Sequence, residues 1–284
     1  MKKLLCILVA LVLPAAVFAA EDINKQADKT PKGQPVLIEK QSVEKQGKPA
    51  PQKLDPVKFE FVRTNLVSTF YHELAHALID IMDLPVYGQE EDAADVFSVV
   101  VIDRLFDSAD ALAINSGGAM GFRVDADDRM GKGREWDWSD EHGPDMQRYY
   151  NIVCLTYGSD PGGRAEFAEK MSLPQERAEY CDGEYTLAKR SWYPVIKRIE
   201  GAKTDEHVGF RESARTALQQ RAAAVIEAEV KLVNDKFNLP RRLRVTVKRC
   251  NRGSNMYAFY SSGRHKITVC TNYIDELYRM APDQ

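Results

Sequence analysis

Apolar residues recur every three to five positions along the first periodic stretch of the chain. They are Phe61, Leu66, Phe70, Leu74, Leu78 and Ile81. This spacing predicts an amphipathic α-helix, because it brings the apolar side chains onto one face. Further helical patterns follow along the chain, at 88–106, 146–157, 176–193, 213–237 and 272–279.

The period changes near the C-terminal end. Leu243, Val245 and Val247 alternate with charged residues, which is typical of a half-buried strand. Two more strand-like runs, 255–260 and 266–270, are joined by Ser-Ser-Gly-Arg, a connection that favours a β-hairpin. We therefore expect an α+β fold, mostly helical, with a small antiparallel sheet at the C-terminal end.

Two segments between the helical patterns carry weaker signals. The glycine-rich run 115–121 lacks both a preceding strand and the G-x-G-x-x-G spacing of a phosphate loop, so it indicates close packing or a loop. The charged segment 124–134 is expected to be a surface loop.

The N-terminal residues predict export. Residues 1–19 have a basic start at Lys2 and Lys3, an apolar run and a short-residue cleavage site ending at Ala19, as a signal peptide does. A membrane anchor is less favoured, because the apolar run is short for a span and contains Pro14. The protein is expected to be periplasmic or secreted, with no stable membrane insertion after cleavage.

The rest of the chain divides into two parts. Residues 20–56 are rich in Lys, Glu, Gln and Pro and bury too little apolar surface to fold, so we expect a disordered linker. Residues 57–284, about 230 in all, are enough for one sizeable domain.

Export changes what the cysteines can do. Cys6 leaves with the signal peptide, and four cysteines remain. In an oxidising compartment four cysteines suggest two disulfides, for which three connectivities are possible. The local spacing favours Cys154 with Cys181 and Cys250 with Cys270. A cysteine zinc site is disfavoured because the chain contains no C-x-x-C motif.

Candidate chemistry concentrates in an H-E-x-x-H motif within the first helical pattern. His72 and His76 are four residues apart, so both rings project from one helix face, where two imidazoles can chelate Zn²⁺. Glu73 is placed to take a proton from water at such a metal. The alternative is a solvated helix face with two histidines that bind nothing.

A catalytic zinc needs a third protein ligand, and the second helical pattern offers one. Glu91 can be that ligand, and Asp95, four residues later, can accept a hydrogen bond from a ligand histidine. The alternative is that these acidic residues only decorate a helix N-terminus, where the macrodipole favours negative charge.

A further histidine lies in an acidic and aromatic loop at 136–145. His142 could stand beside the metal and stabilise a developing oxyanion, which would make it catalytic. The alternative is a histidine that is simply hydrogen-bonded to a nearby aspartate. Asp145, Arg148, Tyr149 and Tyr150 are candidates for the same neighbourhood.

Three segments carry a family resemblance: His-Glu-Leu-Ala-His at 72–76, Leu-Pro-Val-Tyr-Gly at 84–88 and Glu-Glu-Asp-Ala-Ala-Asp at 90–95. They resemble the “putative metallopeptidase” family, a bacterial and mostly exported family of unknown function related to the gluzincins. The resemblance continues through 147–154, 157–161 and 191–192 and so covers most of the chain after the linker.

The resemblance implies a zincin-like domain in which Zn²⁺ is bound by His72, His76 and Glu91. Glu73 would be the general base, and Asp95 would support a ligand histidine. A metzincin site is excluded, because it would need glycine at Ile79 and histidine at Met82.

The C-terminal hairpin resembles one that related families place before the H-E-x-x-H helix, so the chain looks circularly permuted. We therefore expect the hairpin to pack beside the His72–His76 helix, with one strand lining the cleft. Val57 should then lie close to the closing helix at Ile274. The alternative is a hairpin that only covers the core.

The predicted function is zinc-dependent hydrolysis of peptide bonds by a monomer acting on a peptide or protein. A net charge of −3 argues against a nucleic-acid partner. Two alternatives remain: a non-catalytic envelope binding module on a zincin fold, and a zinc amidase acting on cell-wall or small-molecule amides.

Overall fold

A computed structural model describes residues 53–201, 207–251 and 257–282. The predicted signal peptide and nearly all of the predicted linker lie outside the described residues. The helices are α1 (Pro56–Met82), α2 (Glu90–Leu105), α3 (Ser108–Gly131), α4 (Asp145–Gly158), α5 (Ala165–Lys170), α6 (Gln175–Ile199), α7 (Ala217–Lys236) and α8 (Thr271–Met280). The strands are β1 (Val208–Glu212), β2 (Leu243–Lys248), β3 (Ala258–Ser261) and β4 (Lys266–Cys270). The predicted mostly helical α+β fold is confirmed.

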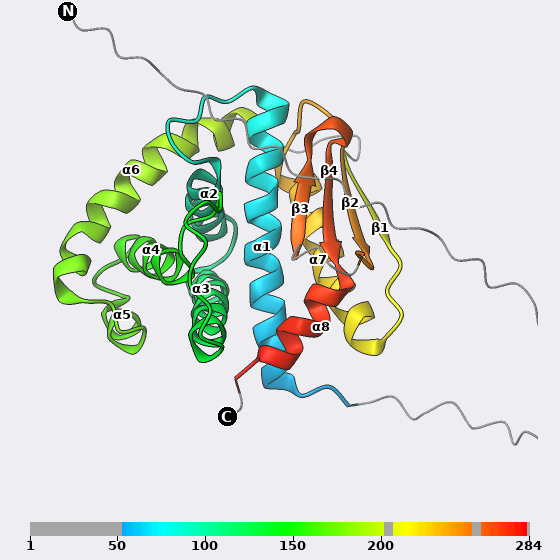
Figure 1. The fold of residues 1–284 in the computed structure, drawn as a ribbon. Helices are drawn as coiled ribbons and strands as arrows, with labels where there is room; N and C mark the ends of the chain where they lie inside the picture. The colour runs from blue at the N-terminus through cyan, green and yellow to red at the C-terminus, as the bar shows by residue number, and fades with distance from the viewer. Residues whose placement is uncertain (1–52, 202–206, 252–256, 283–284) are drawn as a thin grey trace, which may run out of the picture. The chain divides into compact units, whose positions relative to one another are not determined.

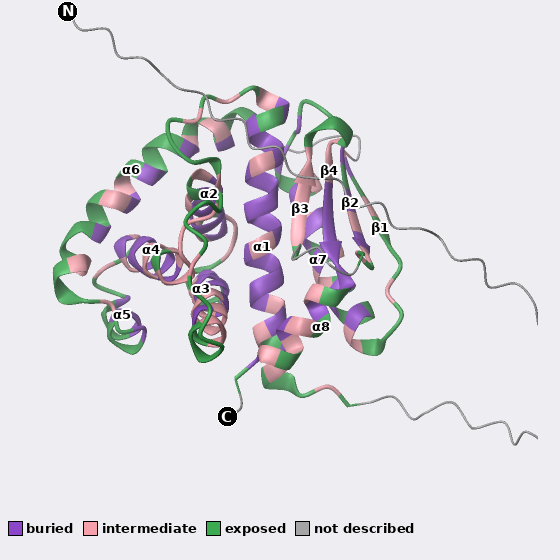
Figure 2. Cartoon of the chain, viewed as in Figure 1, coloured by how far each residue is buried: buried purple, intermediate pink, exposed green. Residues whose placement is uncertain are grey.

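Helix α1 runs through the middle of the domain, between the helices α2, α3, α4 and α6 on one side and the sheet on the other (Figure 1). It packs against α2, α3, α7, α8 and β3. Almost every face of α1 is therefore buried (Figure 2), including the side chains of His72 and Glu73. The periodic pattern predicted the helix. Its polar residues, among them Asn65, Ser68 and His72, are also buried.

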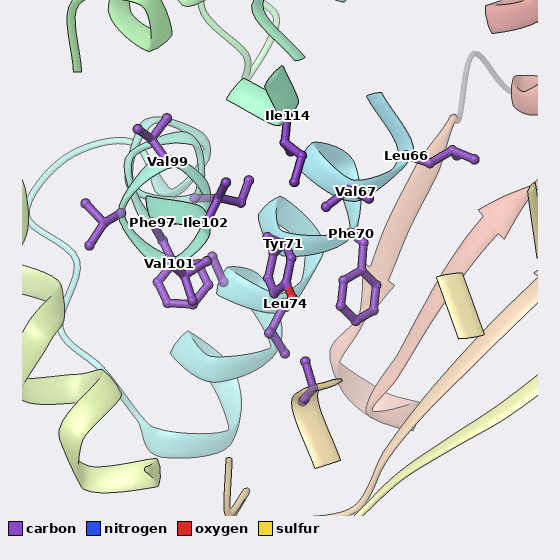
Figure 3. Close-up of a cluster of buried hydrophobic side chains, with 14 of the residues drawn as sticks. Leu66, Val67, Phe70, Tyr71, Leu74, Phe97, Val99, Val101, Ile102 and Ile114 are labelled. Atoms are coloured by element: carbon purple, nitrogen blue, oxygen red, sulfur yellow. The ribbon is translucent and has the colours of Figure 1, made fainter. Parts of the chain in front are cut away.

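The core forms around this helix. Figure 3 shows Tyr71 of α1 on the side of Phe97 and Ile102 of α2, and Val67 near Ile114 of α3, while Leu66 and Phe70 lie on the side of the sheet. All of these side chains are fully excluded from solvent. Burial of side chains of this size contributes about 1.5–3 kcal/mol each, so the core fixes α1 firmly in place.

Both ends of α1 are set by local chemistry. The Asp55 carboxylate accepts hydrogen bonds from the backbone of Val57 and Lys58, and Pro56 occupies the first turn, where a missing N–H costs nothing. At the other end Asp83 adopts a left-handed conformation, and the Leu84 N–H donates back to the Ile79 carbonyl.

The glycine-rich run 115–121 is part of α3, and its glycines let α3 approach α1 closely. A Cβ atom on Gly117 would lie 2.3 Å from Cβ of Thr64, and one on Gly118 would lie 2.4 Å from Oγ of Ser68. Side chains at these positions would force the two helices apart. The expectation of close packing is confirmed.

The expectation of a surface loop at 124–134 is wrong for most of the segment, because α3 continues to Gly131. Charged side chains stabilise this end of the helix as i,i+4 pairs, with Arg123 beside Asp127 and Lys132 beside Asp128. The charged residues of this segment therefore indicate a partly solvated helix end.

The sheet contains the predicted antiparallel pair, β3 with β4, but it is larger and mixed. The strand order is β1-β2-β4-β3, and the pairs β1–β2 and β2–β4 are parallel. Strand β1, whose apolar residues are only Val208 and Phe210, was not predicted. In its pairing with β2, Val208 lies opposite Leu243.

Among the described residues, no strand pairs with the edge of β3 that lies beside α1. The Cys270 N–H donates to the Tyr257 carbonyl, so the bonded pairs with β4 continue at Phe259 and Ser261. The backbone groups of Ala258 and Tyr260 must therefore point away from β4. This places a free strand edge next to the helix that carries the H-E-x-x-H motif.

The expected proximity of the domain's two ends is confirmed. The Asp55 N–H, just before α1, donates to the Tyr278 hydroxyl of α8 at 2.8 Å. Helices α1 and α8 also pack against each other (Figure 1). The chain order that the permutation hypothesis requires is thus geometrically possible.

Both predicted disulfides are present. Cys154 and Cys181 link α4 to α6, and Cys250 and Cys270 tie the end of β4 to the segment after β2, with Cα–Cα distances of 5.1 and 5.4 Å. Two disulfides fit an oxidising, extracellular location. No helix in the described part of the chain has the length and apolar composition needed to cross a bilayer.

The close approach of α1 and α3 can be tested with one substitution and a matched control. Gly117→Ala should destabilise the protein by about 1–3 kcal/mol, because the new methyl group overlaps Thr64. Gly183→Ala, in open space on α6, should be neutral or stabilising by up to about 1 kcal/mol. Urea denaturation measures both, and equal effects would contradict the packing argument.

Candidate metal centre

Three histidine rings converge on one carboxylate. Nε2 of His72 lies 3.1 Å from Oε2 of Glu91, and Nε2 of His142 lies 3.0 Å from the same oxygen. Nε2 of His76 lies 3.4 Å from Oε1 of Glu91 and 3.2 Å from Nε2 of His72. Three ring nitrogens therefore surround one carboxylate group.

Each ring is oriented by a second carboxylate on its other nitrogen. These Nδ1 pairs are His72 with Asp95 at 2.8 Å, His76 with Glu90 at 2.7 Å and His142 with Asp140 at 3.0 Å. A carboxylate can only accept a hydrogen bond, so Nδ1 is the donor in every pair. That leaves Nε2 of all three rings as the nitrogen able to bind a metal ion.

The donors come from three parts of the chain. Helix α1 supplies His72 and His76 from one face, and the first turn of α2 supplies Glu91. Acidic residues favour that turn because they interact well with the positive end of the helix dipole. The segment between α3 and α4 brings His142 to the same place. The acidic start of α2 thus serves both helix stability and the site.

The charges at the centre stabilise one another. Burial would raise the pKa of Glu91, but hydrogen bonds from His142, His72 and His76 outweigh it and hold that pKa well below its ordinary value. Burial would lower the pKa of His72, but Asp95 and Glu91 outweigh it and raise that pKa to about 9. Without a metal, His72 is protonated near neutral pH, so metal binding must displace a proton from it.

Arg148 fixes the support of His72. Its guanidinium donates to both oxygens of Asp95, at 2.7 and 2.8 Å, and lies 4.1 Å from the centre of the Phe122 ring. Burial would raise the pKa of Asp95, but Arg148 and His72 hold it well below its usual range. The sequence placed Arg148 in this neighbourhood without assigning it a partner.

Glu73 lies beside the histidines and is only 6% exposed. Burial raises its pKa, partly offset by His72 and His76 and by a hydrogen bond from the Tyr260 backbone. That hydrogen bond comes from the free edge of β3. A buried carboxylate with a raised pKa, next to a possible metal site, has the properties of a general base.

These residues open into a cleft of about 650 Å³. Its lining includes His72, Glu73, His76, Glu91 and His142, together with Tyr257 and residues 258–260 of β3. The volume is typical of ligand-binding clefts. The prediction that the C-terminal hairpin lines the cleft beside the His72–His76 helix is confirmed.

The donor set fits a zinc ion. Tetrahedral zinc with bonds of about 2.1 Å separates its ligand atoms by about 3.4 Å. Nε2 of His72 lies 3.2 Å from Nε2 of His76 and 3.1 Å from Oε2 of Glu91, which is close to that value, while Nε2 of His76 lies 3.4 Å from the other Glu91 oxygen, Oε1. Among the described residues, the set of three whose donor atoms all lie within 4.8 Å of one another is His72, Glu91 and His142. His142 can therefore be either a neighbour of the metal or a ligand.

The structure gathers seven residues that the sequence nominated for the centre or its neighbourhood: His72, Glu73, His76, Glu91, Asp95, His142 and Arg148. Of the other nominated residues, Asp145 pairs with Arg129, and Tyr149 donates to the Met171 carbonyl. The structure adds Glu90, Asp140 and Tyr260 to the centre. Asp140 lies two residues before His142, and this spacing could have indicated their contact. A hydrogen bond from His142 to a nearby aspartate was the alternative that the sequence analysis gave for this histidine. The contact of Tyr260 with Glu73 joins distant parts of the chain, so no local pattern could indicate it.

Comparison with known families agrees with this geometry. Residues 37–196 match the model of the family described as “Putative metallopeptidase”. The match covers more than half of the 284 residues. The chain belongs to this family. No curated protein and no solved structure matches the chain.

The matched region contains all the candidate metal donors but ends at residue 196, before the sheet. Both the H-E-x-x-H helix and the acidic start of α2 therefore belong to the part that the family shares. The strand edge that forms the other wall of the cleft lies outside that part. The circular permutation remains a prediction, because no matching structure gives a chain order for comparison.

Arg148 offers a test of the support behind the metal donors. Arg148→Met keeps an apolar stem but leaves Asp95 without its cation, so His72 loses its fixed orientation. Zinc affinity should fall about 10–100-fold. Competition with a chelating dye measures this, while circular dichroism verifies folding. Arg123→Met, at an exposed pair with Asp127, is the control and should leave the affinity unchanged. Equal affinities in the two variants would contradict this role of Arg148.

Proposed function

We propose that this protein is a zinc-dependent peptidase of the gluzincin-like H-E-x-x-H type, with His72, His76 and Glu91 as metal ligands. The observation that carries the proposal is the convergence of the Nε2 atoms on Glu91, each ring being fixed through Nδ1 by a carboxylate. Two imidazoles and one carboxylate form a recognised set of catalytic zinc ligands.

The bound zinc would polarise the substrate carbonyl and lower the pKa of a water molecule. Glu73 is the residue that receives the proton of the attacking water, because it lies in the cleft next to His72 and His76. Its raised pKa suits a group that must take up a proton and then release it to the leaving amine. The Tyr260 N–H holds its carboxylate in place.

His142 is proposed to stabilise the negative charge that develops on the carbonyl oxygen. Its ring is held by Asp140, and its Nε2 points to the centre of the site, where Glu91 lies. The hydrogen bond to Glu91 raises the pKa of His142, which favours the form that can donate. A donor placed at such a point lowers the barrier without moving during the reaction.

The substrate is proposed to bind as an added strand on β3. An extended peptide can pair with the backbone groups of Ala258 and with the Tyr260 carbonyl, while the Tyr260 N–H is bonded to Glu73. Because the Tyr260 N–H contacts Glu73, this pairing carries the peptide past the general base. A monomer is sufficient for this arrangement, since all the residues involved come from one chain.

The ligand assignment gives a first prediction. The purified protein should bind about one zinc per chain, and His72→Ala or His76→Ala should remove it, as metal analysis will measure. Glu73→Gln should keep the metal and lower kcat by about 10²–10⁴-fold, because only the proton transfer is lost. Zinc that persists in the His72→Ala protein would show that the assignment is wrong.

The third ligand needs a separate test. Glu91→Ala should weaken zinc binding by more than about 100-fold, beyond the effect of losing a supporting group. The matched control is Asp92→Ala, in the same helical turn but exposed. Glu90 is not a neutral control because it supports His76. Similar losses from Glu91→Ala and Asp92→Ala would argue against Glu91 as a ligand.

A substrate screen on the zinc-loaded protein separates the peptidase from the two alternatives. Cleavage of polypeptides would support the proposal, and cleavage of only cell-wall or small-molecule amides would favour an amidase. Zinc binding without hydrolysis of either class would favour a binding module.

A further inference from the structure

The cleft carries more negative charge than the candidate metal centre uses. Besides Glu73 and Glu91, its lining includes Asp80, Asp83, Glu90 and Glu141. None of the described residues that line it is a lysine or an arginine. Arg241 acts electrostatically on Tyr260, but it is not part of the lining.

A metal ion does not account for these extra carboxylates. The two charges of a zinc ion are matched by Glu73 and Glu91, and Glu90 supports His76. Asp80, Asp83 and Glu141 contact none of the three histidines in the described structure. Asp80 does have neighbours of its own, because its Oδ2 lies 3.8 Å from Nε2 of His265 and accepts a hydrogen bond from Tyr260. The three carboxylates together still give the cleft a negative charge that a substrate can meet.

Helix stability does not account for Asp80 and Asp83 either. They lie in and just after the last turn of α1, where the helix dipole is negative and favours cations. That turn contains no basic residue. Two carboxylates at this place are unfavourable for the helix. The His265 ring lies 3.8 Å from Asp80, and a bound cationic group beside both carboxylates would lower their repulsion.

The strand edge places these carboxylates beside the bound peptide. The Tyr260 hydroxyl of β3 donates to Asp80 at 2.5 Å, while the Tyr260 backbone reaches Glu73. Asp80 and the general base are thus joined through one residue of the proposed substrate-binding strand. Consider a peptide that pairs with β3 and presents its carbonyl near Glu73. One of its side chains next to that carbonyl must then lie beside Asp80.

We propose that the cleft selects peptides that carry a lysine or arginine side chain close to the bond to be cleaved. Asp80 and Asp83 bind that side chain, and the ring of Tyr260 lies next to it. This inference rests on the proposed peptidase function, because it takes the position of the peptide from the metal centre and the β3 edge.

The test measures binding apart from cleavage. Zinc-loaded Glu73→Gln protein is titrated with alanine-based peptides that carry one lysine, scanned through every position, and with glutamine counterparts. At one or two adjacent positions lysine should bind at least about tenfold more tightly than glutamine, as one charge-assisted contact allows. The preference should weaken as salt concentration rises.

A double substitution identifies the residues responsible. Asp80→Asn with Asp83→Asn, added to Glu73→Gln, should abolish the lysine preference while the Tyr260 hydroxyl keeps an acceptor. The control, Asp127→Asn with Glu227→Gln, changes the net charge equally at exposed positions outside the cleft and should keep the preference. The inference is wrong if no peptide binds or if the protein that retains Asp80 and Asp83 shows no preference for lysine. It is also wrong if the protein with both asparagine substitutions keeps the lysine preference.

Cleavage by the wild-type protein distinguishes the two proposals. Hydrolysis of lysine and glutamine peptides at equal kcat/KM would overturn the charge preference alone. Hydrolysis of neither peptide, with the lysine preference retained in binding, would overturn the peptidase proposal alone.

Discussion

The site depends on the pairing of imidazole with carboxylate. Three histidines each donate Nδ1 to an acidic side chain, and all three Nε2 atoms meet at Glu91. Without those pairs the rings could rotate and present either nitrogen. The partly buried Arg148 extends this order outward by holding both oxygens of Asp95. The arrangement of donors is therefore built into the protein before any ion binds.

The fold places this network by burying α1 on nearly all sides (Figure 2). The helices on one side bring the start of α2 to His72 and His76, and the sheet on the other side brings β3 to Glu73. The family match covers the helical side only. The cleft thus has one wall that the family shares and another that the C-terminal part of this chain supplies.

Local spacing predicted what local geometry controls. Four-residue steps on helices indicated His72 with His76 and Glu91 with Asp95, and short sequence separation indicated both disulfides. Non-local contacts could not be read in this way. Strand β1 is held by parallel pairing with β2, and the charged end of α3 is helical where a loop was expected. The part played by Tyr260 depends on a strand that lies far from Glu73 in sequence.

The central claim is that zinc is bound through Nε2 of His72 and His76 and through Glu91. A crystal structure of the zinc-loaded protein, with anomalous data at the zinc edge, tests it directly. We expect one strong peak about 2.1 Å from those three donors, with each Nδ1 still bonded to its carboxylate. The account would be contradicted by a zinc ion bound through Nδ1 of the histidines, by a zinc ion found only beside Asp80 and Asp83, or by a zinc ion that does not contact Glu91.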